Sequence, residues 1–315
     1  MITSVIEFEN KSIVINDSPV KEIGKKFSPG FYTCSASEGG VEIQRSQIKE
    51  LHEPFKSSTY EAAMYAIEAF FHPDVKEKVN GLGFTHKLGL LFYGRQGTGK
   101  TAFMHYISTC LIESRDAIVL FANNGNSLGA GIAVASEIRE IQDNPIVFIM
   151  DEFERYAENN ESDMKQFLDG EASVENCLVL AATNYLDKVP KTIKDRPSRF
   201  KMCLEVKGVE DVEVMREVLI KVSSKLQPSL FSKKRLEEVL DMLSKEQGGV
   251  TIDELKHVCL NEVTNFMLKN PEKRGIGFVR EEDKGRESGS GTYKFLIDNY
   301  EIVPAYKIFK HSYKK

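Results

Sequence analysis

The sequence predicts an α/β protein in which helices flank a parallel sheet, with a β-rich segment before this core and a helical segment after it. Continuous apolar runs, typical of strands buried on both faces, occur at 90–93, 117–121, 146–150 and 177–182. Stretches with helical apolar spacing separate several of these runs. From 209 to about 269 only helical patterns occur.

Composition limits the class of protein. The chain has 315 residues, 41% of them hydrophobic and 28% charged, which is ordinary for one or two globular domains. The net charge of −5 does not indicate nonspecific nucleic-acid binding. Five cysteines are scattered without C-x-x-C spacing, so we expect neither disulfides nor zinc. We predict a cytoplasmic protein, because we find no signal peptide and no apolar run of membrane-spanning length.

The first 57 residues are predicted to be β-rich. Short apolar segments at 5–8 and 12–15 are broken by turn-forming residues. Segments 30–34 and 41–44 flank a Glu-Gly-Gly turn and predict a hairpin. No chemistry is assigned to this region. A helix is expected from about 60 to 71, capped by Ser58 or Thr59.

The predicted core begins with a phosphate-binding loop. Residues 94–101 read G-x-x-x-x-G-K-T between the apolar run 90–93 and a helical pattern over 102–111. Glycines allow backbone N–H groups to surround phosphate oxygens, and the following helix adds positive potential. The predicted nucleotide-binding residues are Gly94, Gln96, Gly97, Thr98, Gly99, Lys100, Thr101 and Ala102. Lys100 would supply charge to the β- and γ-phosphates, and Thr101 a hydroxyl ligand for Mg²⁺.

Two adjacent carboxylates are the next candidates. A strand at 117–121 is followed by a predicted glycine-bearing loop over 123–131 and a helix over 132–142. The buried strand 146–150 then ends in Asp151 and Glu152, where ligands bind in open α/β sheets. Asp151 is the candidate Mg²⁺ residue and Glu152 the candidate general base. Two solvated acids at a strand end are the alternative.

Asn184 and two arginines complete the candidate set. A helix and a turn are expected over 161–176, and the strand 177–182 ends at Thr183 and Asn184. If this strand lies between the two preceding site strands, Asn184 can contact the γ-phosphate or orient water; otherwise it is a turn former. Arg196 and Arg199 flank a proline and form a rigid cationic edge. Their distance in sequence from the loop suggests that they act on the ATP of a neighbouring subunit; surface pairing with acids is the alternative.

Together these motifs resemble those of the AAA+ ATPases, specifically the AAA subgroup, over about 80–265. The segments 94–101 and 146–152 are similar to Walker A and Walker B, 182–184 to sensor 1, and 196–200 to the R-P-G-R-F arginine-finger segment. Residues 249–255 are similar to the family's G-F-S-G-A-D-L. The organisation is most similar to the branch that contains the mitochondrial Rieske-protein translocase and uncharacterised phage ATPases, because of the segments Gly-Leu-Gly-Phe-Thr-His-Lys-Leu-Gly-Leu-Leu-Phe-Tyr-Gly at 81–94 and Phe-Leu-Asp-Gly at 167–170.

The resemblance implies a domain plan and a function. It implies an αβα ATP-binding domain over 58–208, a helical lid over 209–270 and a C-terminal tail over 271–315 that contains a candidate hairpin. Helices are expected at 212–222, 233–243 and 252–268. ATP and Mg²⁺ are the implied cofactors, and the implied assembly is a ring of the chain with itself, a hexamer. Such a ring would couple ATP hydrolysis to remodelling or translocation of a macromolecular client.

Departures from the family pattern keep a second function open. Arg95 and Gln96 replace the two prolines usual after the first Walker glycine. Ser127 stands where protein-threading members of the family place an aromatic residue before Gly-x-Gly. The alternative is therefore an ATP-controlled assembly switch or loader that acts on a protein or nucleic-acid complex.

Overall fold

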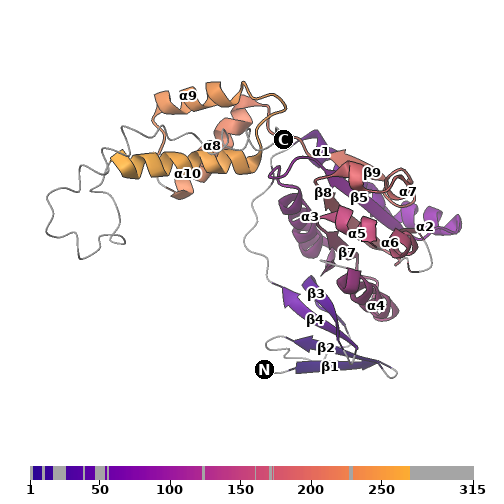
Figure 1. Ribbon diagram of the computed structural model, residues 1–315. Coiled ribbons are helices and arrows are strands. Elements are labelled where there is room, and N and C mark those ends of the chain that lie inside the picture. Colours follow the sequence, from indigo (N-terminus) through magenta and orange to yellow (C-terminus); the bar gives the residue numbers. More distant parts are fainter. Residues whose placement is uncertain are drawn as a thin grey trace. The chain divides into compact units, whose positions relative to one another are not determined.

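The computed structural model describes residues 3–8, 11–16, 26–37, 40–46, 54, 57–122, 125–159, 161–169, 172, 174–226 and 230–269. The chain divides into two compact units, Met1–Val206 and Lys207–Lys315 (Figure 1). The predicted C-terminal hairpin lies outside the described ranges.

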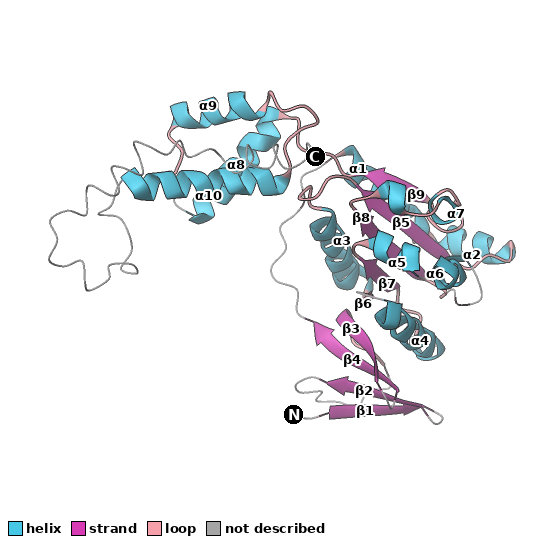
Figure 2. Cartoon of the chain, viewed as in Figure 1, coloured by secondary structure: helices cyan, strands magenta, loops and turns pink. Residues whose placement is uncertain are grey.

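The first unit is built on one sheet. Within the described part of the chain it has nine strands in the order β1-β2-β4-β3-β6-β7-β8-β5-β9 (Figure 2). Six neighbouring strands, from β3 to β9 in that order, run parallel. The predicted α/β class with a parallel sheet flanked by helices is confirmed. The strands are β1 (Thr3–Phe8), β2 (Lys11–Asn16), β3 (Gly30–Ser37), β4 (Gly40–Ser46), β5 (Lys87–Tyr93), β6 (Ile118–Phe121), β7 (Ile146–Met150), β8 (Cys177–Thr183) and β9 (Met202–Glu205).

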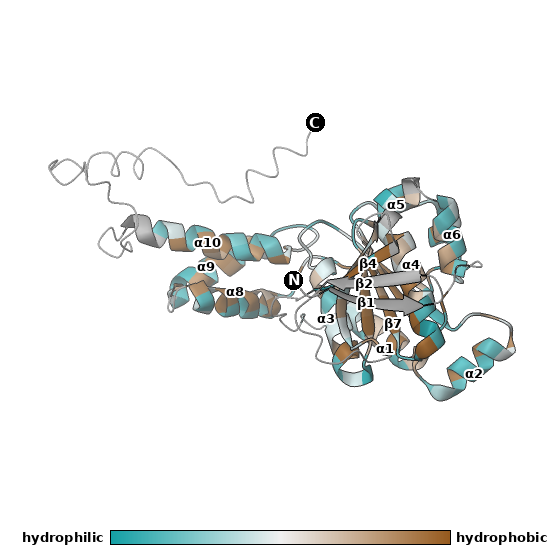
Figure 3. Ribbon diagram, turned by 90° about the horizontal axis from the view of Figure 1, so that it is seen from below, coloured by the Kyte–Doolittle hydropathy of each residue, from teal (hydrophilic) through white to brown (hydrophobic). Residues whose placement is uncertain are grey.

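Helices cover both faces of this sheet. α1 (Ser58–Phe70) and α3 (Lys100–Arg115) pack on one face, where Leu90 and Phe92 contribute to the core. α4 (Gly125–Ile141), α5 (Phe153–Asn159) and α6 (Glu161–Asp169) pack on the other, where Leu91 contributes. Figure 3 shows hydrophobic residues concentrated in the central strands and hydrophilic residues on the surrounding helices. The remaining short elements are α2 (Pro73–Gly81), η1 (Leu186–Lys188) and α7 (Lys191–Lys194).

The N-terminal strands extend the core sheet. The strands of the predicted hairpin are confirmed, because β3 and β4 pair in antiparallel register, whereas residues 38–39 of its predicted turn lie outside the described ranges. β3 also pairs in parallel with β6, so the hairpin adds directly to the parallel part of the sheet. The Gln142 carboxamide accepts from the Phe27 N–H at 2.7 Å and donates to the Phe27 carbonyl at 3.2 Å. This double hydrogen bond fixes the chain just before β3.

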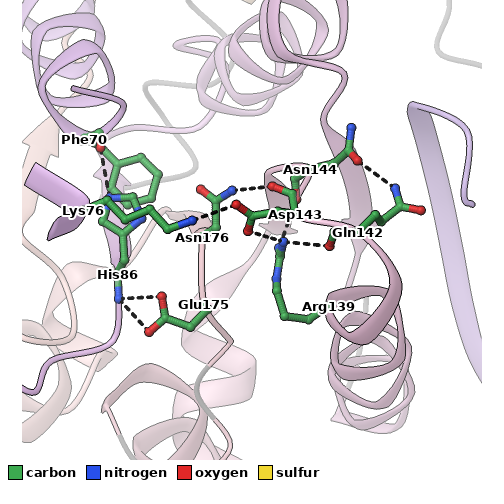
Figure 4. Close-up of polar contacts among 9 residues, drawn as sticks. All are labelled: Phe70, Lys76, His86, Arg139, Gln142, Asp143, Asn144, Glu175 and Asn176. Atoms are coloured by element: carbon green, nitrogen blue, oxygen red, sulfur yellow. Dashed lines mark hydrogen bonds and ion pairs between the residues drawn. The ribbon is translucent and has the colours of Figure 1, made fainter. Parts of the chain in front are cut away.

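A polar cluster ties loops together at the amino ends of the parallel strands (Figure 4). Asp143 forms ion pairs with Lys76 at 2.7 Å and with Arg139 at 3.1 Å, and its carbonyl accepts from Asn176 at 2.7 Å. The His86 ring is stacked on Phe70 with 4.0 Å between centroids, and its Nε2 lies 3.0 Å from the Phe70 carbonyl oxygen. Desolvation by burial lowers the pKa of His86. The cluster therefore joins α1, α2, α4 and the start of β5.

Two local predictions were wrong. The predicted glycine-bearing loop over 123–131 is helical from Gly125 onward, because α4 begins there. Leu128 and Ala130 are buried in the core, and a Cβ on Gly131 would lie 3.1 Å from the Phe148 ring, so packing keeps this stretch helical. The cap of α1 is Ser57, whose hydroxyl accepts from the Tyr60 N–H at 3.1 Å, rather than Ser58 or Thr59.

The second unit contains the three predicted helices in its described part. They are α8 (Val212–Leu226), α9 (Lys233–Leu243) and α10 (Ile252–Lys269). Their buried faces include Leu219, Leu240 and Leu255. Val209 and Val250 exchange backbone hydrogen bonds of 2.7 and 2.8 Å next to α10. None of the helices among the described residues has the length and apolarity needed to cross a membrane.

Candidate nucleotide-binding site

Three neighbouring strands bring the candidate residues together at the carboxyl ends of the parallel strands. β8 lies between β7 and β5, with Met150 opposite Ala181 and Tyr93 opposite Thr183. The phosphate-binding loop, Asp151 and Asn184 each follow the carboxyl end of one of these strands. The strand order on which the Asn184 prediction depended is therefore present.

The loop backbone takes conformations that favour glycine. Gly94, Gly97 and Gly99 have φ angles of 145°, 81° and 94°. A Cβ on Gly94 would lie 2.3 Å from the Val206 carbonyl oxygen, which leaves no room for a side chain. Gly99 is the N-cap of α3, so the free N–H groups of the first helical turn open onto the loop. This is a backbone arrangement that binds phosphate.

Lys100 is held inside this loop. Its ammonium group donates to the carbonyl oxygens of Gly94 and Arg95, both at 2.8 Å, and the residue is only 6% exposed. Burial lowers the pKa of Lys100, while the charges of Asp151 and Glu154 oppose that shift. The cation is thus positioned by the chain itself between the loop and the acids at the strand ends.

Thr101 and Asp151 supply a pair of oxygen ligands. The Thr101 hydroxyl donates to Asp151 Oδ2 at 2.6 Å, and Asp151 Oδ1 accepts from the Glu152 N–H at 2.9 Å. Among residues that the structure describes, no group of three or more His, Cys, Asp or Glu is placed to hold a metal. Mg²⁺ in nucleotide sites uses few protein oxygens together with phosphates and water, so the hydroxyl and carboxylate present here fit that ion.

Glu152 begins a short segment that connects the strand ends. Its φ of 50° is left-handed, which is uncommon for a residue with a side chain. Its carboxylate is half-exposed and forms an ion pair with Arg155 at 2.8 Å. Two residues later, buried Glu154 accepts a hydrogen bond of 2.5 Å from the Thr183 hydroxyl. Asn184 follows Thr183 and is partly buried.

The two arginines lie toward the opposite ends of the parallel strands, their amino ends. The Lys201 N–H donates to the Gly89 carbonyl at 2.9 Å, and the Arg199 carbonyl is so close that a Cβ on Gly89 would lie 2.1 Å from it. Gly89 precedes the loop glycine Gly94 by five strand positions, or about 16 Å at ~3.3 Å per residue. An arginine side chain that starts beside Gly89 cannot span that distance to the loop of its own chain.

The two arginines differ in exposure. Arg196 is 61% exposed and forms an ion pair with Asp169 at 3.3 Å. Arg199 is 6% exposed; its Nε contacts Asp169 at 3.0 Å and its Nη1 donates to the Thr192 carbonyl at 2.5 Å. Ser198 also donates to Asp169, at 2.9 Å. One carboxylate therefore binds three residues of this segment, and Arg196 remains accessible to another molecule.

Residues 90–207 match the family described as ATPase family associated with various cellular activities (AAA). This stretch of the chain is therefore similar to AAA ATPase domains. The match begins inside β5 and ends just after β9, so it contains the whole candidate set. The prediction of an ATP-hydrolysing enzyme is confirmed at the level of this domain, whereas the subgroup within the family stays a prediction.

Curated proteins are similar to the chain over stretches longer than the family match. ATP-dependent zinc metalloprotease FtsH 2 of Thermoanaerobacter sp. (strain X514) is 28% identical over 218 residues, which are 63% of this chain and 40% of that protein. Protein CdcH of Halobacterium salinarum is 26% identical over 209 residues, 60% of this chain and 25% of that protein. The Cell division cycle protein 48 homolog of Archaeoglobus fulgidus is 24% identical over 231 residues, which are 68% of this chain and 28% of that protein. The chain thus spans between a quarter and two fifths of the length of these relatives.

Several residues of the matched region escaped the sequence analysis. Glu154, Arg155 and Asp169 contact candidate residues, but the sequence assigned none of them a role. Glu154 meets Thr183 from 29 positions away, and Asp169 meets Arg199 from 30 positions away. The one available signal was the place of Glu154 two positions after Glu152, and a solvated acid on a helix accounts for such a residue equally well.

Proposed function

We propose that the chain is an oligomeric, Mg²⁺-dependent ATPase that couples ATP hydrolysis to remodelling or translocation of a macromolecular client. The observation that carries this proposal is the convergence of the loop, Asp151, Glu152 and Asn184 at the carboxyl ends of the parallel strands, with exposed Arg196 on a segment seated about 16 Å away. In this proposal the loop, Asp151, Glu152 and Asn184 would form most of a hydrolysis site, and Arg196 would complete the site of another copy.

Each candidate residue has a role in this proposal. The backbone of Gly94, Gln96, Gly97, Thr98, Gly99, Lys100, Thr101 and Ala102 would cradle the phosphates, and the Lys100 ammonium would turn from its carbonyl partners to them. Thr101 and Asp151 would hold Mg²⁺, which supplies charge neutralisation when bound. Glu152 would leave Arg155 to accept a proton from the attacking water, and Asn184 would orient that water.

The arginines would act between subunits. Arg196 is exposed, and its own chain's loop is out of reach, so we assign it to the ATP of a second copy. Arg199 is held by Asp169 and Thr192 and would first have to leave them to touch a phosphate; in the free chain it anchors the segment that carries Arg196. A site completed in this way favours a closed ring, and we propose a hexamer. None of the five cysteines, all of which the structure describes, forms a disulfide bond, and we propose the cytoplasm as the compartment of the chain.

The test of hydrolysis is Glu152→Gln, compared with Glu113→Gln on the exposed side of α3. Removing the general base should lower ATP turnover by about a hundredfold or more, while ATP affinity stays within about threefold. Glu113→Gln should match the wild type in both measurements. Unchanged turnover in Glu152→Gln would exclude the assigned base.

One observation favours the switch or loader as a second candidate. Residues 125–131 are helical, and Ser127 at the position of the expected aromatic is 7% exposed, so no aromatic grip on a polypeptide is built there. Stimulation of ATP turnover by an unfolded polypeptide would support translocation, and stimulation by DNA a loader. The ATP-trapped Glu152→Gln protein should retain its client in a pull-down from the native source.

A further inference from the structure

A buried carboxylate–hydroxyl contact joins two of the strand ends at the candidate site. Glu154 is 6% exposed and Thr183 is 1% exposed. The Thr183 hydroxyl donates to Glu154 Oε2 at 2.5 Å, and the same hydroxyl accepts from the Tyr185 N–H at 3.0 Å. Its single proton and one of its lone pairs are therefore both used.

These two bonds enclose Asn184. Thr183 is the last residue of β8, and Tyr185 lies two positions later, so one hydroxyl fixes the backbone on both sides of Asn184. This local turn resembles the hydroxyl-to-backbone turns that compete with regular structure. Here the turn has an external anchor, because Glu154 belongs to α5 and follows Glu152 by only two residues.

α5 is itself fixed against neighbouring strands. The Tyr156 hydroxyl donates to the Ala122 carbonyl just beyond β6, and Phe153 is fully buried with its ring edge-to-face on Phe200 at 5.2 Å. Glu154 therefore projects from a helix held on both sides. The left-handed backbone of Glu152 immediately precedes this helix, and such a backbone persists when its surroundings over-determine it.

We propose that Thr183 and Glu154 are positioning residues that set the direction of the Asn184 side chain relative to the Glu152 carboxylate. The contact would keep the water-orienting amide and the general base in one geometry through the reaction. The proposal rests on the proposed function, since it concerns the same hydrolysis site. It assigns Glu154 and Thr183 no contact with ATP.

The main test compares Thr183→Val, which removes the hydroxyl, with Thr183→Ser, which retains it. Loss of one buried hydrogen bond that acts in the transition state should lower kcat about tenfold in Thr183→Val, with KM for ATP within about twofold. Thr183→Ser should keep kcat within about threefold. A purely structural role predicts lower thermal stability with unchanged kcat at a temperature where both variants are folded, which would overturn the proposal.

A second comparison uses the Asn184→Ala background. If Thr183 acts through Asn184, adding Thr183→Val to Asn184→Ala should lower kcat no further; a second tenfold loss would contradict the proposal.

Glu154→Gln provides a further test if Thr183→Val does not fold, because it retains an acceptor for the Thr183 hydroxyl. This variant should keep kcat within about threefold, and a larger loss would count against hydrogen bonding as the cause. Glu152→Gln is measured in parallel. If Glu152→Gln turns over normally, the proposed function fails; if it stalls but Thr183→Val does not slow, only this inference fails.

Discussion

Gly89 offers a test of how the arginine segment is seated on the sheet. Its position in β5 is extended and buried, yet a Cβ there would lie 2.1 Å from the Arg199 carbonyl oxygen and 3.1 Å from the Phe200 ring. Ordinary van der Waals contact requires about 3.4 Å or more. Gly89→Ala must therefore move a backbone segment by more than about 1 Å or break the hydrogen bond from the Lys201 N–H to the Gly89 carbonyl.

The expected cost lies at the upper end of overpacking, about 3 kcal/mol in the free energy of unfolding. For a unit of about 200 residues this lowers the melting temperature by roughly 6–12 °C. Calorimetry and urea unfolding would measure it. Gly129→Ala in α4 is the matched control, because no atom lies within 4 Å of its added Cβ and it should stabilise the helix by about 0.5–1 kcal/mol. A Gly89→Ala protein as stable as the wild type would refute the close seating of this segment.

Three further outcomes are expected. Gln142→Ala leaves two backbone groups of Phe27 without partners and should lower the free energy of unfolding by about 2 kcal/mol, measured in urea. Burial lowers the pKa of His86, so below pH ~6.5 the unfolded state binds a proton at this side chain that the folded state does not. The free energy of unfolding should therefore keep its full value above pH ~6.5 and decrease as the pH falls toward the lowered pKa. His86→Gln should flatten that dependence and exposed His72→Gln should not, as pH-dependent calorimetry would report. Asp151→Asn should lower Mg²⁺-dependent ATP turnover by about a hundredfold or more in a coupled assay, and retention of wild-type turnover would argue against it as a metal ligand.

The sequence predicted the parts of the site that local chemistry dictates. Gly94, Gly97 and Gly99 are readable because their backbone conformations disfavour residues with a side chain, and Lys100 and Thr101 follow at fixed offsets. The buried strands were readable because short, continuous apolar runs next to turn-forming residues are typical of strands covered on both faces. The hairpin before β6 was predicted from its turn, but its pairing with β6 depends on a contact between distant segments.

Tertiary contacts account for what the sequence did not predict. Gly129 and Gly131 favoured a loop in the sequence, yet this stretch is a helix, because Leu128 packs in the core and Gly131 packs against Phe148. The short edge strand β9 and the four-residue helix α7 are too brief for a periodic signal. The burial of Arg199 depends on Asp169 across 30 positions, which residue type alone cannot indicate.

Complementation between two inactive variants tests the central claim most directly. Glu152→Gln lacks the general base but retains Arg196, whereas Arg196→Ala lacks the exposed arginine but retains the base. Each alone should hydrolyse ATP slowly. If one copy completes the site of the next, an equal mixture should recover about a quarter of wild-type turnover, since about that fraction of random interfaces pairs an intact site with an intact arginine. A mixture no more active than the average of its two components would contradict a site shared between copies.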